Sequence, residues 1–272
     1  MPTREPLFRD PFAREFLPQP LTRVLRVARL RSLRPWIERY ADYRAPGART
    51  SAIGRTRYID EIVLQAREQG SRQLVLLGAG FDCRAHRLAE LRDSVAFEVD
   101  RDEIQQLKQS RLLLATELAP RDDIRYVAVD FLRDDVAERL SAAGWSRQQR
   151  STFVWEGVSN YLSEGAVQEV LSMVGGSGAG SVLVFTYLHR GVLDGSVRFA
   201  GGDKLLQNVQ RLGEPWTFGL DPRELASYLS RFGLELEQDL GADEYRARYR
   251  AALGKNPPGY AFYRIAACRV RG

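Results

Sequence analysis

The chain has 272 residues, of which 44% are hydrophobic and 28% charged, a balance typical of a globular protein built on one large domain. Its apolar runs are shorter than the roughly 18 residues of a membrane span. Two cysteines and two histidines are too few for a disulfide framework or for a metal site built on those residues, so we expect neither.

The net charge of +5 is unevenly distributed along the chain. Residues 1–60 contain 13 arginines, no lysine and 6 acids, which gives this segment +7 and leaves the remainder near −2. Such a segment suits an anionic acceptor, a nucleic acid or a membrane surface, and it is equally compatible with a solvated arginine-rich surface. The first twenty residues carry acids and prolines where a signal peptide has an apolar core, so we expect a cytoplasmic protein.

The N-terminal part is predicted to be helical. Apolar residues recur at helical spacing over 21–28, and Pro35 interrupts the continuation of that helix. A second stripe predicts a helix over 51–70, with Gly70 as its C-terminal stop. We therefore divide the chain into a helical cap over 1–54 and a main domain over 55–272.

Apolar strands alternate with helices in the main domain. Helices are expected over 101–118 and 164–174, and strands are expected over 73–80, 94–100, 124–130, 152–158 and 181–188. Continuous apolar strands separated by helices are typical of a parallel sheet covered on both faces. Two further strand-like segments, 234–240 and 263–270, have no evident helix between them and could pair antiparallel at the sheet edge.

The segment 189–222 breaks this alternation, because it is rich in glycine and too long for a simple connection. We interpret it as a cap or substrate loop inserted after the fifth strand. The predicted fold class is α/β: a doubly wound, Rossmann-like, mostly parallel sheet with an antiparallel edge, an N-terminal helical cap and this insertion.

A glycine turn follows the first strand, in the sequence "LVLLGAGFDCRAHRL". Gly78 and Gly80 allow the backbone to approach a ligand closely. A dinucleotide fingerprint has a third glycine, but Cys83 stands in its place and Asp82 lies within the turn. Asp82 could contact a cofactor amino group or cap the following helix. Cys83 is expected to be a small buried apolar residue.

Acidic residues end three successive strands. Asp100 ends the second strand about twenty residues after the glycines, where an acid can accept hydrogen bonds from a ribose. Asp130, followed by Phe131, could bind an adenine amino group and cover the ring. Glu156 ends the fourth strand. Each acid alone is compatible with a helix cap, but three together would repel a diphosphate and suit a cationic nucleotide such as S-adenosyl-L-methionine.

Together these motifs resemble a known family. The segments "RTRYIDEIV", "LGAGFDCRAHRL", "FEVD", "YVAVDF", "EGVSNYL" and "GEPWTFG" stand in the order and spacing of the leucine carboxyl methyltransferase family, which includes polyketide O-methyltransferases. The resemblance runs from about Arg55 to Phe218. It implies a class I S-adenosyl-L-methionine-dependent methyltransferase.

The resemblance also implies roles for single residues. The cofactor carboxylate would pair with Arg55, or with its neighbour Arg57, and Tyr161 would face the methyl-transfer centre. The other cofactor-binding residues implied by the motifs, or placed by the glycine turn, are Gly78, Gly80, Asp82, Asp100, Asp130, Phe131 and Glu156. The family commonly has threonine or serine where this chain has Cys83.

The methyl acceptor is expected to be a small molecule that is anionic or aromatic, and polyketide-type natural products are among the candidates. A carboxylate acceptor is ionised at neutral pH and needs no general base, whereas a phenol or alcohol does better with one. The scarcity of histidine favours a carboxylate, but His189 directly follows the fifth strand, where it could act as a base or have no chemical role. Arginines of the cap could hold an anionic acceptor.

Three other functions compete with small-molecule O-methylation. The first is methylation of a protein or peptide C-terminal carboxylate. The second is a protein that binds the cofactor without catalysis. The third, methylation of nucleic acid, is disfavoured because "WEGV" ends the fourth strand where an Asn/Asp-Pro-Pro-Tyr-like tetrad would be expected. We expect neither a nucleic-acid nor a membrane partner.

Overall fold

The computed structural model describes residues 7–18, 21, 33–45, 47–115, 120–211, 213, 215–253 and 258–272. Seven strands form one sheet in the order β3-β2-β1-β4-β5-β7-β6. They are β1 (Gln73–Leu77), β2 (Val95–Asp100), β3 (Arg125–Ala128), β4 (Ser151–Trp155), β5 (Val182–Leu188), β6 (Leu234–Leu240) and β7 (Tyr263–Val270). The first five are parallel, and β7 runs antiparallel to both β5 and β6. The predicted fold class is therefore confirmed, including the antiparallel edge.

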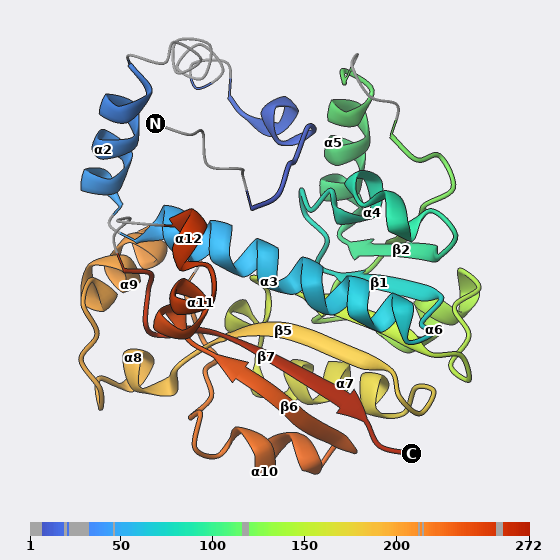
Figure 1. Ribbon diagram of the computed structural model, residues 1–272. Helices are drawn as coiled ribbons and strands as arrows, with labels where there is room; N and C mark the ends of the chain where they lie inside the picture. Colours follow the sequence, from blue (N-terminus) through green and yellow to red (C-terminus); the bar gives the residue numbers. More distant parts are fainter. Residues whose placement is uncertain are drawn as a thin grey trace.

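Side chains of the central strands alternate between two apolar clusters, one on each face of the sheet. On one face, Val75 and Leu77 pack with residues of α6 (Val136–Ala142), α7 (Glu164–Gly175) and α10 (Leu225–Ser230). On the other face, Leu74 and Leu76 pack against α3 (Ala48–Glu68), which lies across the sheet in Figure 1. Strands buried on both faces explain why their sequences are continuous apolar runs.

Two predicted helices lead into and away from the first strands. The helix expected over 51–70 is α3, which begins earlier and ends before Gly70, whose φ is +98°. The predicted boundary between residues 54 and 55 falls inside this continuous helix. The helix expected over 101–118 is α5 (Asp102–Leu112).

The N-terminal segment contains two described helices, η1 (Ala13–Phe16) and α2 (Arg34–Arg44). Pro35 lies in the first turn of α2, where proline is well tolerated because it replaces a backbone NH that has no helical partner. The helix predicted over 21–28 lies outside the described residues except for Leu21. Among the described helices, none is long and apolar enough to cross a bilayer.

The C-terminal part differs from prediction between the last two strands. The sequence showed no evident helix there, but the structure has α11 (Ala242–Arg248) and α12 (Arg250–Leu253). These helices are too short for a periodic pattern to show, and they depend on tertiary contacts. A Cβ on Gly54 of α3 would stand 2.6 Å from the Tyr245 ring, so the absence of a side chain at Gly54 lets α11 pack closely.

The predicted insertion 189–222 contains α8 (Arg190–Asp194) and α9 (Gly202–Arg211). Its end returns to the sheet, where the Leu220 amide donates to the Leu188 carbonyl of β5 at 2.9 Å. The remaining short helices are α4 (Arg84–Arg87), η2 (Ala89–Leu91) and η3 (Ser159–Tyr161).

Candidate cofactor site

The glycine turn after β1 is held tightly in place. Gly78 and Gly80 have φ values of +67° and +46°, in the left-handed region that favours glycine. A Cβ on Gly78 would lie 2.3 Å from Cγ2 of Val158, so no side chain fits there. The Gly80 amide donates to Oδ2 of Asp100 at 2.6 Å, which joins the turn to the end of β2.

A cavity of about 520 Å³ opens at the carboxyl ends of β1 and β4. Its wall combines the glycine turn with the beginning of α3, the residues after β4 and three residues of the N-terminal segment. The polar and glycine positions in this wall include Arg55, Gly78, Gly80, Asp82, Arg84, Arg87, Glu156 and Asp10. This volume is in the range of small-molecule and cofactor sites, and the position is the usual one for a ligand of a doubly wound sheet.

Arg55 and Glu156 meet in the wall of this cavity. Arg55 Nε donates to Glu156 Oε1 at 2.7 Å, and the Arg55 guanidinium also lies 5.0 Å from the centre of the Tyr263 ring. Burial alone would raise the pKa of Glu156, but the guanidinium groups of Arg55 and Arg84 reverse that effect and hold the pKa below its usual value. Glu156 is therefore a carboxylate at neutral pH.

Arg84 is the hub of a buried charge cluster. It is 1% exposed, and its guanidinium contacts Asp60 of α3 at 2.8 Å, Glu156 at 3.1 Å and the Asp82 carboxylate. Arg87 shares Asp60 at 2.7 Å. Since a buried charge is tolerated only when it is paired, these contacts fix the carboxylates of three different chain segments relative to one another.

Asp82, for which the sequence allowed a cofactor contact or a helix cap, contacts the start of α4, and its contact with a cofactor stays a prediction. Its carboxylate accepts a hydrogen bond from the Arg84 backbone amide at 2.8 Å and pairs with the Arg84 guanidinium. Asp82 thus satisfies the first turn of α4 while it also lines the cavity. The neighbouring Cys83 is 1% exposed and packs with Phe12 and Leu112, as expected for a small apolar residue.

Arg55 and Arg57 also occupy different places. Arg55 lines the cavity, whereas Arg57 Nε pairs with Glu61 at 2.9 Å and its Nη1 donates to the Leu7 carbonyl at 3.2 Å. Of the two candidates, only Arg55 points its guanidinium at Glu156. Arg55 is therefore the arginine in position to reach a ligand in the cavity.

The residues expected around the nucleoside lie at neighbouring strand ends but outside the wall of this cavity. Asp100 accepts from the amides of Gly80 and Arg101. Asp130 accepts from the Leu132 amide at 3.0 Å, and Phe131 packs half-buried against the core on the α6–α7 side. Their assignment to ribose and adenine stays a prediction.

Tyr161 and His189, expected on the acceptor side, also lie outside the cavity wall. Tyr161 is 40% exposed in η3, which follows β4. His189 Nδ1 accepts from the Gly191 amide at 3.0 Å and caps α8, and its ring lies 5.1 Å from that of Phe199. Burial lowers the pKa of His189, so the neutral ring is favoured and the nitrogen that could accept a proton already serves the cap.

Comparison with known proteins places the chain in a family. A model of the family described as leucine carboxyl methyltransferase matches residues 1–175. The chain belongs to this family. A protein of Mycobacterium bovis named "Putative S-adenosyl-L-methionine-dependent methyltransferase" is 34% identical over 183 residues, which cover 67% of this chain and 51% of the relative. A Frankia alni protein with the same description is 37% identical over 202 residues, covering 72% of this chain and 66% of the relative.

The chain thus spans about half the length of the mycobacterial relative. Among solved structures, a DUF574 family protein of Streptomyces avermitilis has a TM-score of 0.62 at 18% identity and covers 84% of this chain and 87% of its own. A protein of Thermobifida fusca, titled a putative methyltransferase, has a TM-score of 0.59 at 21% identity, with 86% of each chain covered. At these identities the similarity shows the Rossmann-like methyltransferase fold.

Two charged residues of this candidate site, Arg84 and Asp10, could not be assigned to it from the sequence. The position of Arg84 directly after a buried glycine turn indicated a place near the site. Its pairing could not be inferred, because its three carboxylate partners are spread along the chain. Asp10 carried no such signal, because no periodic pattern surrounds it.

Tyr263 was missed as well. Its hydroxyl lies 3.2 Å from Thr186 Oγ1, which accepts from the Gly157 amide at 2.8 Å. These contacts join β7, β5 and the turn after β4 next to Arg55. Tyr263 stands about a hundred residues along the chain from Gly157, so no local pattern could have indicated the contact.

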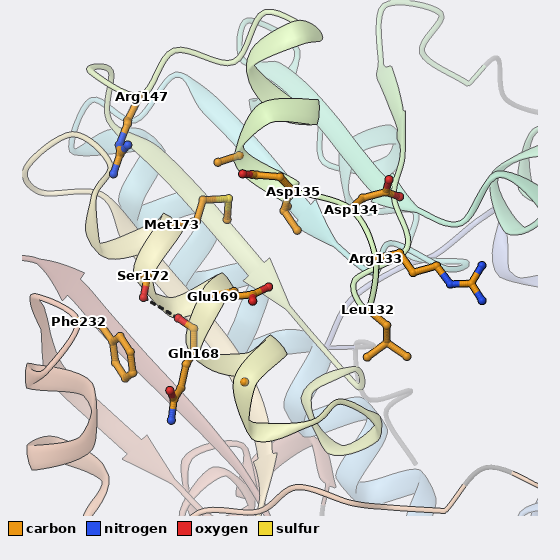
Figure 2. Close-up of a pocket in the computed structure, with 13 residues that line it drawn as sticks. Leu132, Arg133, Asp134, Asp135, Arg147, Gln168, Glu169, Ser172, Met173 and Phe232 are labelled. Atoms are coloured by element: carbon orange, nitrogen blue, oxygen red, sulfur yellow. Dashed lines mark hydrogen bonds between the residues drawn. The ribbon is translucent and has the colours of Figure 1, made fainter.

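This family member has a larger cavity elsewhere, a groove of about 800 Å³ between α6 and α7. Figure 2 shows Asp135 on one side of this groove and Gln168, Glu169 and Ser172 of α7 on the other, with Ser172 Oγ donating to the Gln168 carbonyl. None of the predicted site residues lines the groove, and the glycine turn lies outside its wall. The cavity at the glycine turn is therefore the candidate cofactor site.

Proposed function

We propose that this protein is an S-adenosyl-L-methionine-dependent O-methyltransferase that acts on a carboxylate of a small molecule. The observation that carries the proposal is the 2.7 Å pair of Arg55 and Glu156 in the cavity wall. The methionine end of the cofactor bears an ammonium and a carboxylate on one carbon. Arg55 can therefore exchange Glu156 for the carboxylate of the ligand, and Glu156 can exchange Arg55 for the ammonium.

The residues present fit this cofactor. The cavity of about 520 Å³ is large enough for a nucleoside with an amino-acid tail. Its wall carries three carboxylates beside three guanidinium groups, a mixed set that suits the ammonium and the carboxylate of an amino-acid tail. The names of the relatives agree with this choice.

When bound, S-adenosyl-L-methionine supplies a methyl group that its sulfonium has already activated. The protein then has to orient the acceptor and exclude water. Arg55 would hold the carboxylate of the amino-acid tail, and Glu156 the ammonium. Gly78, which presents bare backbone to the cavity, would let the turn lie against the tail.

The acceptor side favours a carboxylate over a phenol or an alcohol. A carboxylate is already ionised at neutral pH, whereas a hydroxyl acceptor needs a base. The best-placed base by sequence was His189, and its Nδ1 is occupied by the Gly191 amide. The hydroxyl of Tyr161, which is 40% exposed, is a donor suited to orienting an anionic oxygen.

Binding of the cofactor is tested by calorimetric titration of the wild type and two arginine variants. We expect Arg55→Met to weaken S-adenosyl-L-methionine binding by about 10- to 100-fold, because a hydrogen bond to a charged group contributes about 1.5–3 kcal/mol. Arg67→Met is the matched control, since Arg67 lies on the same helix and pairs with Asp93 away from the cavity, and it should change affinity by less than about threefold. Equal losses in both variants would contradict the assignment.

Methyl transfer is tested with cofactor labelled in the methyl group and a panel of small carboxylic acids and phenols. Transfer to a carboxylate gives an ester that releases labelled methanol in alkali, whereas an aryl ether keeps its label. Binding without labelled product from either class would favour a non-catalytic cofactor-binding protein. Alkali-stable product from phenols alone would refute the carboxylate acceptor.

A further inference from the structure

The N-terminal segment 7–18 packs over the glycine turn. Phe12 is 2% exposed and lies in a cluster with Cys83 and Leu112. Phe16 stacks on Phe81 with ring centres 4.7 Å apart. In Figure 1 this dark blue segment lies beside α5, in agreement with the contacts between η1 and that helix. Residues 7–18 are therefore packed against the glycine turn and form part of the candidate cofactor site.

Two contacts hold the segment on the side that precedes Phe12. The Leu7 carbonyl accepts from Arg57 Nη1 at 3.2 Å, and the Arg87 guanidinium lies 5.3 Å from the centre of the Phe8 ring. Asp10 stands between these contacts and the buried Phe12. Its position in the cavity wall is thus fixed from both sides.

The local role of Asp10 is to cap η1. Its Oδ1 accepts from the Phe12 amide at 3.0 Å and from the Ala13 amide at 3.1 Å. Within the described part of the chain, no cation lies within ion-pair distance of this carboxylate. Burial raises the pKa of Asp10, and the two amides together with the more distant Arg87 offset only part of that effect. Asp10 is thus a half-buried acid that a cationic ligand would stabilise.

The other charges of the wall compensate one another. Arg55 and Arg84 pair with Glu156, and Arg84 also pairs with Asp82. Arg87 pairs with Asp60 directly behind the wall. When Asp60 is counted with the described charges of the wall, the set sums to −1, and Asp10 is its one acid without an ion-pair partner among the described residues.

We propose that Asp10 is a specificity-determining residue that makes the cavity prefer a sulfonium nucleotide over the corresponding thioether. This inference rests on the proposed function. S-adenosyl-L-methionine carries one net positive charge, whereas S-adenosyl-L-homocysteine, which remains after methyl transfer, carries none. An excess negative charge in a partly desolvated wall attracts the first and is indifferent to the second. This preference promotes the replacement of bound S-adenosyl-L-homocysteine by S-adenosyl-L-methionine after each turnover.

The test is Asp10→Asn, which removes the charge but keeps a side chain that caps a helix about as well as aspartate. Dissociation constants for S-adenosyl-L-methionine and S-adenosyl-L-homocysteine are measured by calorimetry at one pH and ionic strength. We expect the ratio of the two constants to shift by about five- to tenfold toward the thioether, through weaker binding of the sulfonium compound. Sinefungin, in which a protonated amine replaces the methylated sulfur, should follow the sulfonium compound.

The matched control is Asp93→Asn, which removes an exposed carboxylate that pairs with Arg67 away from the cavity. Thermal unfolding of both variants checks that they are folded. An unchanged ratio in Asp10→Asn, or an equal loss of affinity for both nucleotides, overturns the inference. If the wild type binds neither nucleotide, the proposed function itself is refuted, and the inference falls with it.

Discussion

Gly78 and Gly80 provide a matched pair for testing the glycine turn. Both have a positive φ, so alanine at either position adopts a strained backbone. They differ in their surroundings. A Cβ on Gly78 meets Val158 Cγ2 at 2.3 Å, whereas the nearest atom to a Cβ on Gly80 is the Gly78 carbonyl oxygen at 3.9 Å. Comparison of Gly78→Ala with Gly80→Ala thus separates backbone strain from side-chain overlap.

The expected magnitudes follow from these two terms. The left-handed backbone costs an alanine about 1–2 kcal/mol, and this applies to both variants. Forcing a methyl group into a filled site costs about 1–3 kcal/mol more, and this applies to Gly78→Ala alone. We expect Gly80→Ala to lower the free energy of unfolding by about 1–2 kcal/mol and Gly78→Ala by about 2–5 kcal/mol.

Urea unfolding without ligand, followed by tryptophan fluorescence, measures both values. Adding Val158→Ala to Gly78→Ala removes the overlapping methyl groups, so the double variant should recover about 1–3 kcal/mol relative to the sum of the single changes. Equal destabilisation by the two glycine substitutions would refute the close approach of Val158. Strict additivity in the double variant would do the same.

Two further predictions concern the histidines. His189→Ala should lower the free energy of unfolding by about 0.5–2 kcal/mol, because the variant loses the α8 cap. The profile of activity against pH should keep its shape. A loss of turnover of about 10²-fold or more would instead indicate that His189 acts as a general base. Burial lowers the pKa of His86 to about 4 and raises that of the neighbouring Glu98 to about 7. The contribution of His86 to the free energy of unfolding is lost as the pH falls from 6.5 through 4. The contribution of Glu98 is lost as the pH rises from 4.5 through 7. In the wild type, the two groups therefore change the free energy of unfolding in opposite directions as the pH rises. His86→Gln should unmask a fall in the free energy of unfolding as the pH rises between 4.5 and 7, and an unchanged slope in urea titrations would contradict this account.

The sheet could be predicted because its signals are local. Each buried strand is a continuous apolar run, and acids such as Asp100 and Glu156 mark where two of the strands end. Residues at the carboxyl ends of parallel strands share one edge, so the position of the site followed from the fold. The antiparallel pairing of β6 and β7 was predicted correctly, although its premise that no helix separates them was wrong, because α11 and α12 lie between the two strands.

The charge cluster could not be predicted, because its geometry is set by contacts between distant segments. Arg84 reaches Asp60 across 24 residues and Glu156 across 72. The position of Asp10 depends on the burial of Phe12 against Cys83, which a four-residue 3-10 helix does not reveal in sequence. Sequence spacing also could not separate Arg55 from Arg57, which lie less than one helical turn apart.

The burial of Arg84 restricts how the cofactor end of the site can change over evolution. Neutralising any one of Asp60, Asp82 or Glu156 removes one of the three carboxylates that contact this buried guanidinium, so single substitutions there are expected to be costly. The segment 189–222 has no comparable ion-pair hub among its described residues. Substitutions are therefore expected to be tolerated more readily in that segment than at the Arg84 cluster, whose carboxylates come from three separate parts of the chain.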